Sequence, residues 1–249
     1  MVEKKRLDLL MVEKGLEESR SKAQARIMAG EVVVNDQRVD KPGTAIKTDA
    51  HIRLKGDGNP YASRGGLKIK GAFQHWPISV KDQICLDVGA STGGFTDFLL
   101  QHGAQKIYAI DVGYGQLHWK LQTDDRVVNM ERTHILKVPE GALQPPPTFC
   151  VMDVSFISVT KILPHLRNLL KRPAELTILV KPQFELSPSE IGKGGIVRDE
   201  ENRQKALNAV IETAQKNGYQ VVESILSPLQ GADGNQEYLL YLQLPSGEA

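Results

Sequence analysis

The stretch from residue 84 to residue 97, ICLDVGASTGGFTD, decides the fold of this 249-residue chain. Its first five residues are apolar except for Asp87, and they predict a buried strand. Glycines and small polar residues follow, and a helix is expected to begin directly after them. A strand that passes through a glycine-rich turn into a helix is the arrangement that holds a nucleotide-like cofactor.

Beyond this stretch the chain alternates between strand and helix patterns. That alternation predicts an α/β domain with a Rossmann-like, mostly parallel sheet that is covered by helices on both faces. The last two strands are separated only by SPLQGADGNQ, so an antiparallel hairpin is expected at the sheet edge. Strands are expected near residues 84–88, 106–111, 126–130, 148–153, 175–181, 219–226 and 236–243, and helices near 65–75, 93–102, 158–170 and 199–217.

The glycine-rich turn offers contacts for one kind of cofactor in particular. Ser91 stands where a dinucleotide-binding turn has its second glycine, and Asp87 would repel a pyrophosphate but could pair with the amino group of a methionine moiety. Asp111 ends the next expected strand, where a carboxylate can accept hydrogen bonds from ribose hydroxyls. S-adenosylmethionine therefore fits better than NAD or another nucleotide, with a purely structural turn as a further alternative. The expected cofactor contacts are Asp87, Gly89, Ser91, Gly93, Gly94, Asp111, Asp153 and Phe156. Phe156 either lines the pocket or packs in the core.

Four polar residues form a candidate catalytic group. They are Lys68 in SRGGLK, Asp153 in VMDVSF, Lys181 in LVKPQF and Glu237 in NQEYLL. The last three lie within or beside apolar runs, where a charge must be paired or functional because burying it alone is costly. Taken singly, Lys68 could be a solvated helix residue, Asp153 a helix cap and Glu237 an ion-pair partner at a sheet edge.

These residue types suit transfer of a methyl group to a sugar hydroxyl. Positioning and removal of the hydroxyl proton are most of what an enzyme must supply for that reaction. A lysine can accept a proton only when it is neutral, and burial beside a second ammonium, that of Lys68, would favour neutral Lys181. Asp153 and Glu237 would then orient the two amines.

The front of the chain is a separate, basic unit. Residues 1–70 hold 15 Lys and Arg against 10 Asp and Glu, while residues 71–249 hold 16 against 20. Helices are expected over 6–15 and 21–30, followed by a small sheet with a hairpin over 32–40 that turns at Asn35 and Asp36, and by a strand at 51–55. The mixed stretch KGDGNPYAS predicts a linker. We expect an α+β domain over 1–58, a linker over 59–64 and the main domain over 65–245.

The string SRSKAQARIMAGEVVVNDQRVDKPG, residues 19–43, resembles the small RNA-binding domain named after ribosomal protein S4. This resemblance implies that the basic face of the second helix and the following loop contact structured RNA, since basic side chains bind phosphates independently of sequence. It carries over to Arg6, Arg20, Lys22, Arg26 and Lys41. Arg64, in SRGG, would either touch an RNA phosphate or brace the linker.

The order Lys68, Asp153, Lys181 and Glu237, together with DVGASTGGFTD, resembles the FtsJ-type ribose 2′-O-methyltransferases. With the front domain, the whole chain is similar to the TlyA family, which also carries the name hemolysin A. The resemblance implies methylation of a ribose, that of cytidine, in ribosomal RNA with S-adenosylmethionine as the methyl donor. It carries the catalytic roles over to the four residues directly.

Other features limit the possible classes of function. The sequence has no run of 18 apolar residues, and its charged start lacks the apolar core of a signal peptide, so a cytoplasmic protein without a membrane partner is expected. Cys85 and Cys150 lie in apolar runs typical of buried thiols, and no His and Cys cluster has zinc spacing, so no metal is expected. A catalytically silent RNA-binding factor and a membrane-lytic hemolysin are the competing interpretations. The sequence does not specify the target nucleotide, the ribosomal subunit or the oligomeric state.

Overall fold

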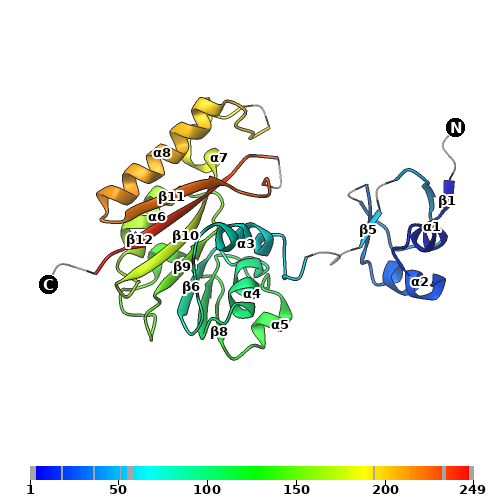
Figure 1. Cartoon of the computed structure of the whole chain (residues 1–249), viewed down its shortest axis with the longest axis horizontal. Helices are drawn as coiled ribbons and strands as arrows, with labels where there is room; N and C mark the ends of the chain where they lie inside the picture. Colours follow the sequence, from blue (N-terminus) through cyan, green and yellow to red (C-terminus); the bar gives the residue numbers. More distant parts are fainter. Residues whose placement is uncertain are drawn as a thin grey trace. The chain divides into compact units, whose positions relative to one another are not determined.

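The computed structural model describes residues 4–17, 19–35, 37–50, 52–54, 59–192, 194–231 and 234–246. The chain divides into two compact units, Met1–Pro60 and Tyr61–Ala249 (Figure 1). Each unit has a hydrophobic core of its own. Residues 55–58, part of the stretch KGDGNPYAS, lie outside the described residues.

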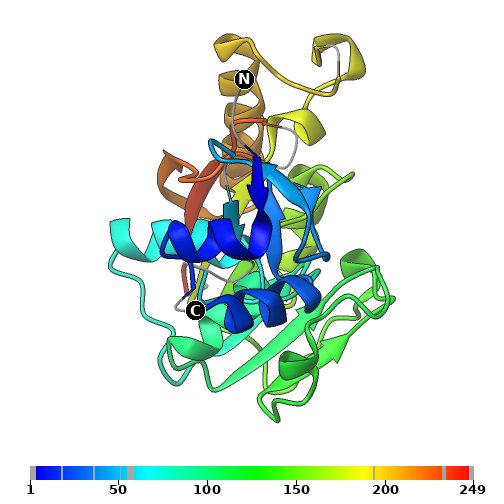
Figure 2. The same ribbon diagram turned by 90° about the vertical axis from the view of Figure 1, so that its right-hand side faces the viewer.

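The first unit places two helices against short strands. Helices α1 (Leu7–Glu13) and α2 (Arg20–Met28) lie side by side, and their buried faces share one core with the strands (Figure 2). The expected hairpin is present, because Val34 pairs with Gln37, although Asp36 of its turn lies outside the described residues. The expected small sheet is present with the order β3-β2-β5, and a second sheet, made of β1 and β4, was not expected. The strands are β1 (Lys4–Arg6), β2 (Val32–Val34), β3 (Gln37–Arg38), β4 (Ala45–Lys47) and β5 (Ile52–Leu54).

The second unit is built on a seven-stranded sheet with the order β11-β12-β10-β9-β6-β7-β8. Strand β12 runs antiparallel to both of its neighbours, and the pairs formed among β10, β9, β6, β7 and β8 are all parallel. This arrangement confirms the mostly parallel sheet and the antiparallel hairpin at its edge. The strands are β6 (Ile84–Val88), β7 (Lys106–Ile110), β8 (Val127–Met130), β9 (Phe149–Met152), β10 (Ala174–Val180), β11 (Gln220–Leu226) and β12 (Tyr238–Leu244).

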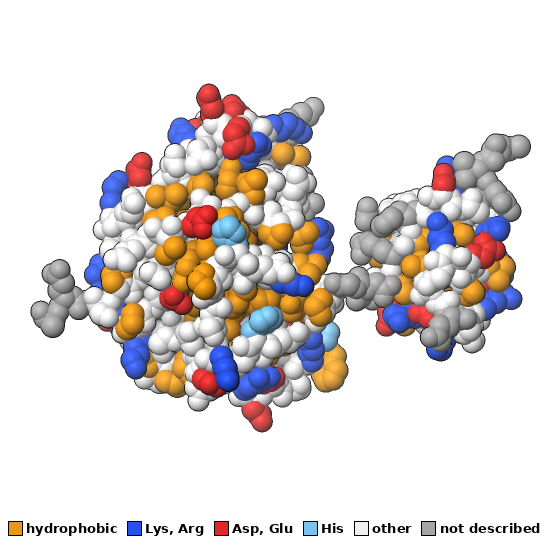
Figure 3. Space-filling view, viewed as in Figure 1, with side chains coloured by type: hydrophobic (Ala, Val, Ile, Leu, Met, Phe, Trp, Pro, Cys, Tyr) orange, Lys and Arg blue, Asp and Glu red, His pale blue; other side chains and the backbone are white. Residues whose placement is uncertain are grey.

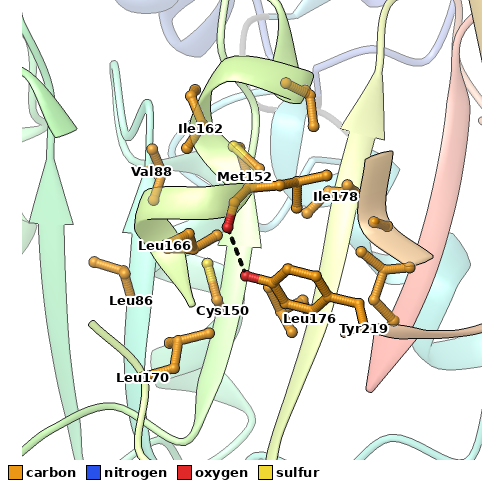
Figure 4. Packing of buried hydrophobic residues seen from close by; sticks show 14 of the residues in the cluster. Leu86, Val88, Cys150, Met152, Ile162, Leu166, Leu170, Leu176, Ile178 and Tyr219 are labelled. Atoms are coloured by element: carbon orange, nitrogen blue, oxygen red, sulfur yellow. Dashed lines mark hydrogen bonds between the residues drawn. The ribbon is translucent and has the colours of Figure 1, made fainter. Parts of the chain in front are cut away.

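Helices cover both faces of this sheet, and alternate strand residues form two cores. On one face α3 (Gly65–His75) and α4 (Gly94–Gln101) pack over residues such as Cys85 and Phe149. On the other face α6 (Val159–Leu166) and α8 (Glu200–Lys216) pack over residues that include Leu86, and Figure 4 shows part of this core. There the hydroxyl of Tyr219 donates a 2.9 Å hydrogen bond to the carbonyl oxygen of Leu163, which satisfies both buried groups.

Four short helices of the second unit were not expected from the sequence. Each has only three or four residues, too few to carry a helical periodicity. They are α5 (Trp119–Gln122), η1 (Ile135–Lys137), α7 (Pro182–Glu185) and η2 (Pro188–Glu190).

Candidate active site

The four candidate catalytic residues meet as two ion pairs. Lys68 Nζ lies 2.5 Å from Glu237 Oε2, and Lys181 Nζ lies 2.6 Å from Asp153 Oδ1. The four side chains are between 2% and 21% exposed, so these charges have lost most of their contact with water. Charges buried to this degree must be paired, and the structure supplies a partner for each.

Strand register brings these residues together. Val180 pairs with Tyr238 across the antiparallel strands β10 and β12, so Lys181 and Glu237, the next residues outward, end at the same edge. Asp153 directly follows β9 and donates its N–H to the carbonyl oxygen of Val88, the last residue of β6. Lys181 and Glu237 were expected within strands, but both lie just outside them, because the strands end where the chain turns toward the site.

The charges of the two pairs act on one another. Burial raises the pKa of Glu237, while the ammonium groups of Lys68 and Lys181 act to lower it and the carboxylate of Asp153 raises it further. Lys181 also donates to Ser155 Oγ at 3.0 Å and lies over the ring of Phe184. Asp153, Ser155 and Phe184 together fix the position of this amine at the site.

Three adjoining cavities surround the ion pairs. Asp153 lines the first and second cavities, and Lys68 lines the first and third cavities. Phe156 lines the second and third cavities. The three cavities therefore meet at two candidate catalytic residues and Phe156. Their volumes are about 340, 340 and 490 Å³ respectively. The first is lined mainly by residues 63–68 and 89–95, the second by residues 110–116, 133–135 and 153–157, and the third by residues that include Lys181, Gln183, Phe184, Ile191, Gly195 and Glu237.

Asp111 organises the wall between the first two cavities. Its carboxylate accepts hydrogen bonds from the backbone N–H of Ser91 and of Gly113, each at 2.7 Å. These bonds hold the glycine-rich turn of β6 against the loop that follows β7. Each carboxylate oxygen can accept a second hydrogen bond, so Asp111 can still receive one from a bound hydroxyl.

Comparison with known proteins then settles the class of the molecule. The FtsJ-like methyltransferase family matches residues 61–244, and the S4 domain matches residues 5–52. The chain belongs to the FtsJ-like methyltransferase family. These two matches confirm the expected fold of both parts, a methyltransferase sheet and a small RNA-binding type of domain.

Full-length relatives combine the same two parts. A Bacillus subtilis protein named as a candidate rRNA methyltransferase, YqxC, is 49% identical over 97% of this chain and 86% of its own length. A Mycobacterium tuberculosis protein named 16S/23S rRNA (cytidine-2′-O)-methyltransferase TlyA is 40% identical over the whole chain and 93% of its own length.

Solved structures agree with this assignment. A structure titled as a candidate hemolysin from Streptococcus thermophilus is 43% identical, covers 99% of this chain and 90% of its own, and has a TM-score of 0.76. An S-adenosylmethionine-dependent methyltransferase from Mesorhizobium loti, 12% identical with a TM-score of 0.54, covers 73% of this chain and 100% of its own and shares the fold.

The backbone of the glycine-rich turn in this FtsJ-like methyltransferase lies close to two other segments. A Cβ atom at Gly89, where φ is +85°, would lie 2.3 Å from the carbonyl oxygen of Asp153. A Cβ at Gly94 would lie 2.2 Å from Ser63 Oγ and 2.9 Å from the backbone nitrogen of Gly66. The starts of α3 and α4 therefore approach each other at the first cavity, and the partial positive charge of the two helix N-termini favours a negatively charged group there.

Asp87 lies below the turn and is fully buried. Its Oδ2 accepts a 2.6 Å hydrogen bond from Thr96, and its Oδ1 has no hydrogen-bond partner among the described residues. Burial raises the pKa of this carboxyl to about 7, against the opposing hydrogen bond from Thr96. The contact between Asp87 and a methionine amino group stays a prediction, and it requires the ligand to reach a buried oxygen.

Phe156 lies at the cavities and is not packed in the core. The side chain is 91% exposed, its backbone has a φ of +65°, and its ring lies 5.2 Å from that of Phe184. A large apolar side chain in this backbone region costs free energy, which is typical of functional positions. Phe184, Gln183 and His134 also line these cavities, and the sequence did not single them out because they lie in the segments beyond the ends of β10 and β8.

The candidate RNA-contacting residues of the first unit differ in their surroundings. Arg6 and Arg20 both bind Asp8, and Arg26 binds Glu17. Lys22 and Lys41 are exposed on α2 and on the loop before β4. In the second unit Arg64 is exposed and lines the first cavity. On the face of that unit drawn in Figure 3, basic side chains are scattered among acidic and apolar ones.

Proposed function

We propose that this chain transfers a methyl group from S-adenosylmethionine to the 2′-hydroxyl of a ribose, that of a cytidine, in ribosomal RNA. The observation that carries the proposal is the meeting of Lys68, Asp153, Lys181 and Glu237 where three cavities join. The relatives described above, one of them named for cytidine 2′-O-methylation of rRNA, support the substrate.

The first two cavities together would hold the cofactor. Asp111 would accept hydrogen bonds from the ribose of the adenosine, and Ser91 and Gly94 would pack closely against the methionine part, while Gly93 would shape the turn from the side of Leu117 and Leu121. Asp153 and Phe156 would line the junction toward the acceptor, while Asp87 supports the turn from below. When bound, S-adenosylmethionine supplies a methyl group on a positively charged sulfur.

The third cavity would receive the ribose of the target nucleotide. Lys181 would accept the proton that leaves the 2′-hydroxyl, because it lines this cavity together with Glu237 and its amine contacts Asp153. Ser155 and Asp153 would orient this amine through their contacts with Nζ, and Glu237 would orient Lys68. A general base of this kind contributes on the order of a hundredfold to ten-thousandfold to the rate.

Binding of RNA would fall mainly to the first unit, through Arg6, Arg20, Lys22, Arg26 and Lys41, with Arg64 beside the active site. A structured RNA does not present a paired ribose to a cavity, so the target nucleotide would be extruded from its helix. A protein that methylates ribosomal RNA would act in the cytoplasm.

The name hemolysin, which the Streptococcus thermophilus structure carries, suggests a different function. Among the residues that the structure describes, no helix combines the length and the apolar character needed to cross a bilayer. The ion-paired active site favours methyl transfer over lysis, and leakage of dye from liposomes with purified protein tests the alternative.

Ribosomal subunits from cells that lack this protein are the substrate for the deciding experiment. Incubation with the purified chain and methyl-labelled S-adenosylmethionine should label the rRNA, and mapping of 2′-O-methyl positions should show a new site at a cytidine. Binding of the subunits without any transfer of label would support the catalytically silent RNA-binding factor and contradict the proposal.

A further inference from the structure

Asp8 is a buried carboxylate with an unusual set of partners. Its side chain is 0% exposed, although it lies in the first turn of α1 in a small, basic unit. Arg6 donates to it from Nε and Nη2, both at 3.0 Å, and Arg20 donates from Nε at 2.9 Å. Gln24 adds a bond of 2.8 Å from Nε2. The carboxylate is therefore surrounded by donors from α2 and from the residues before α1.

Both arginines nevertheless keep a surface for another partner. The side chain of Arg6 is 47% exposed and that of Arg20 is 51% exposed. Arg20 uses only Nε toward Asp8, and Arg6 keeps Nη1 outside its two-bond contact. A guanidinium has five N–H groups, so each arginine can bind a second anion while Asp8 fixes its orientation.

A third cation comes from the loop before β4. The backbone N–H of Asp8 donates to the carbonyl oxygen of Pro42 at 3.1 Å, which brings the loop that carries Lys41 to the start of α1. Gly43 allows this approach, because a Cβ there would lie 3.3 Å from Nη1 of Arg6. Two guanidiniums on one carboxylate keep a net positive charge, and the neighbouring ammonium adds to it. Such a group suits a phosphate, which guanidiniums bind through paired hydrogen bonds.

We propose that Asp8 is a positioning residue that holds Arg6 and Arg20 side by side as a binding site for one RNA phosphate, with Lys41 at its edge. This inference rests on the proposed function, in which these three cations contact RNA. It adds that an acidic residue strengthens RNA binding, because an arginine that is already oriented loses less side-chain entropy when it binds.

The test compares two substitutions that change the charge equally. Asp8→Asn and Asp49→Asn each remove one negative charge from the first unit, and Asp49 is exposed. Charge alone predicts tighter RNA binding for both. The positioning role predicts that full-length Asp8→Asn binds ribosomal subunits at least about fivefold more weakly, while Asp49→Asn binds as wild type or more tightly. Asp8→Asn should also show a shallower dependence of affinity on salt, because fewer phosphate contacts form.

Two further variants make every outcome informative. The double variant Arg6→Lys and Arg20→Lys keeps the charge but loses the forked geometry, and it should also bind more weakly. If Asp8→Asn lowers the melting temperature of the protein, the RNA affinity of this double variant tests the positioning role instead. If folded Asp8→Asn, or the folded double variant Arg6→Lys and Arg20→Lys, binds ribosomal subunits with wild-type affinity, the positioning role of Asp8 is overturned. If the double variant Arg6→Ala and Arg20→Ala binds RNA normally, the RNA contacts of the proposed function fail instead.

Discussion

Burial gives Asp87 a different chemistry from that of the partly exposed carboxylates around it. Removal from water raises its pKa to about 7, and the nearby charges of Asp153 and Asp111 contribute in the same direction. In the unfolded chain the same group has an ordinary pKa near 3.8. The folded protein therefore binds a proton at Asp87 over a pH range in which the unfolded chain does not.

This difference predicts a pH-dependent stability. A carboxyl with a raised pKa stabilises the fold most below about pH 4, and this contribution is lost as the pH rises through about 7. The free energy of unfolding of the wild type, relative to Asp87→Asn, should fall between these values by up to about 1.4 kcal/mol per pH unit. Urea unfolding at pH 5, 6, 7 and 8 measures it, with Asp125→Asn, at an exposed position, as the control. A constant difference between wild type and Asp87→Asn would show that the carboxyl is ionised throughout.

At the scale of elements, Glu185 connects two segments that carry active-site residues. This residue ends α7, and its carboxylate accepts hydrogen bonds from Ser158 Oγ at 2.5 Å and from the backbone N–H of Val159 at 2.9 Å. It thereby caps α6 from another element. Burial raises its pKa, and these hydrogen bonds act against that rise. The loop with Phe156 and the helix that follows Lys181 are held together by this carboxylate.

Glu185→Gln should loosen both segments. A glutamine amide places N–H groups where the carboxylate accepted hydrogen bonds, and one buried donor left without a partner costs about 1–3 kcal/mol. We expect the free energy of unfolding to fall by about that amount and methyl transfer to slow. Glu212→Gln, on the exposed face of α8, should change stability by about 0.5 kcal/mol or less. Equal effects of the two substitutions in urea unfolding would contradict the role of Glu185.

The elements also show how far the sequence predicts this molecule. Apolar runs such as the one in β10 predicted the strands closely. The last residues of the expected strands indicated Asp111, Asp153 and Lys181, because parallel strands end at one edge of the sheet. The strand pair β1 and β4 was not predicted, because each strand has only three residues and so short an alternation is not distinctive. The burial of Asp8 was not predicted either. A charged residue in a helix is expected to be exposed, and the side chains that bury Asp8 include some from a different helix.

For the whole molecule, the proposed function gives the two units separate tasks. Each has its own core, so residues 61–249 should fold without the first unit and bind S-adenosylmethionine with unchanged affinity. Most phosphate contacts would be lost, so kcat/KM for ribosomal subunits should fall by at least about tenfold, because each phosphate contact adds to affinity. Calorimetry with the cofactor and steady-state methylation measure the two effects. Full activity of the fragment would mean that the second unit recognises RNA by itself.

In the proposed function, the amine of Lys181 takes the proton from the ribose hydroxyl. Its most direct test is the single-turnover rate of methyl transfer to ribosomal subunits by Lys181→Ala and Lys181→Arg, with cofactor affinity measured on the same samples. We expect both variants to transfer methyl groups at rates at least about a hundredfold below wild type, with cofactor affinity largely unchanged. Rates within about tenfold of wild type would contradict it.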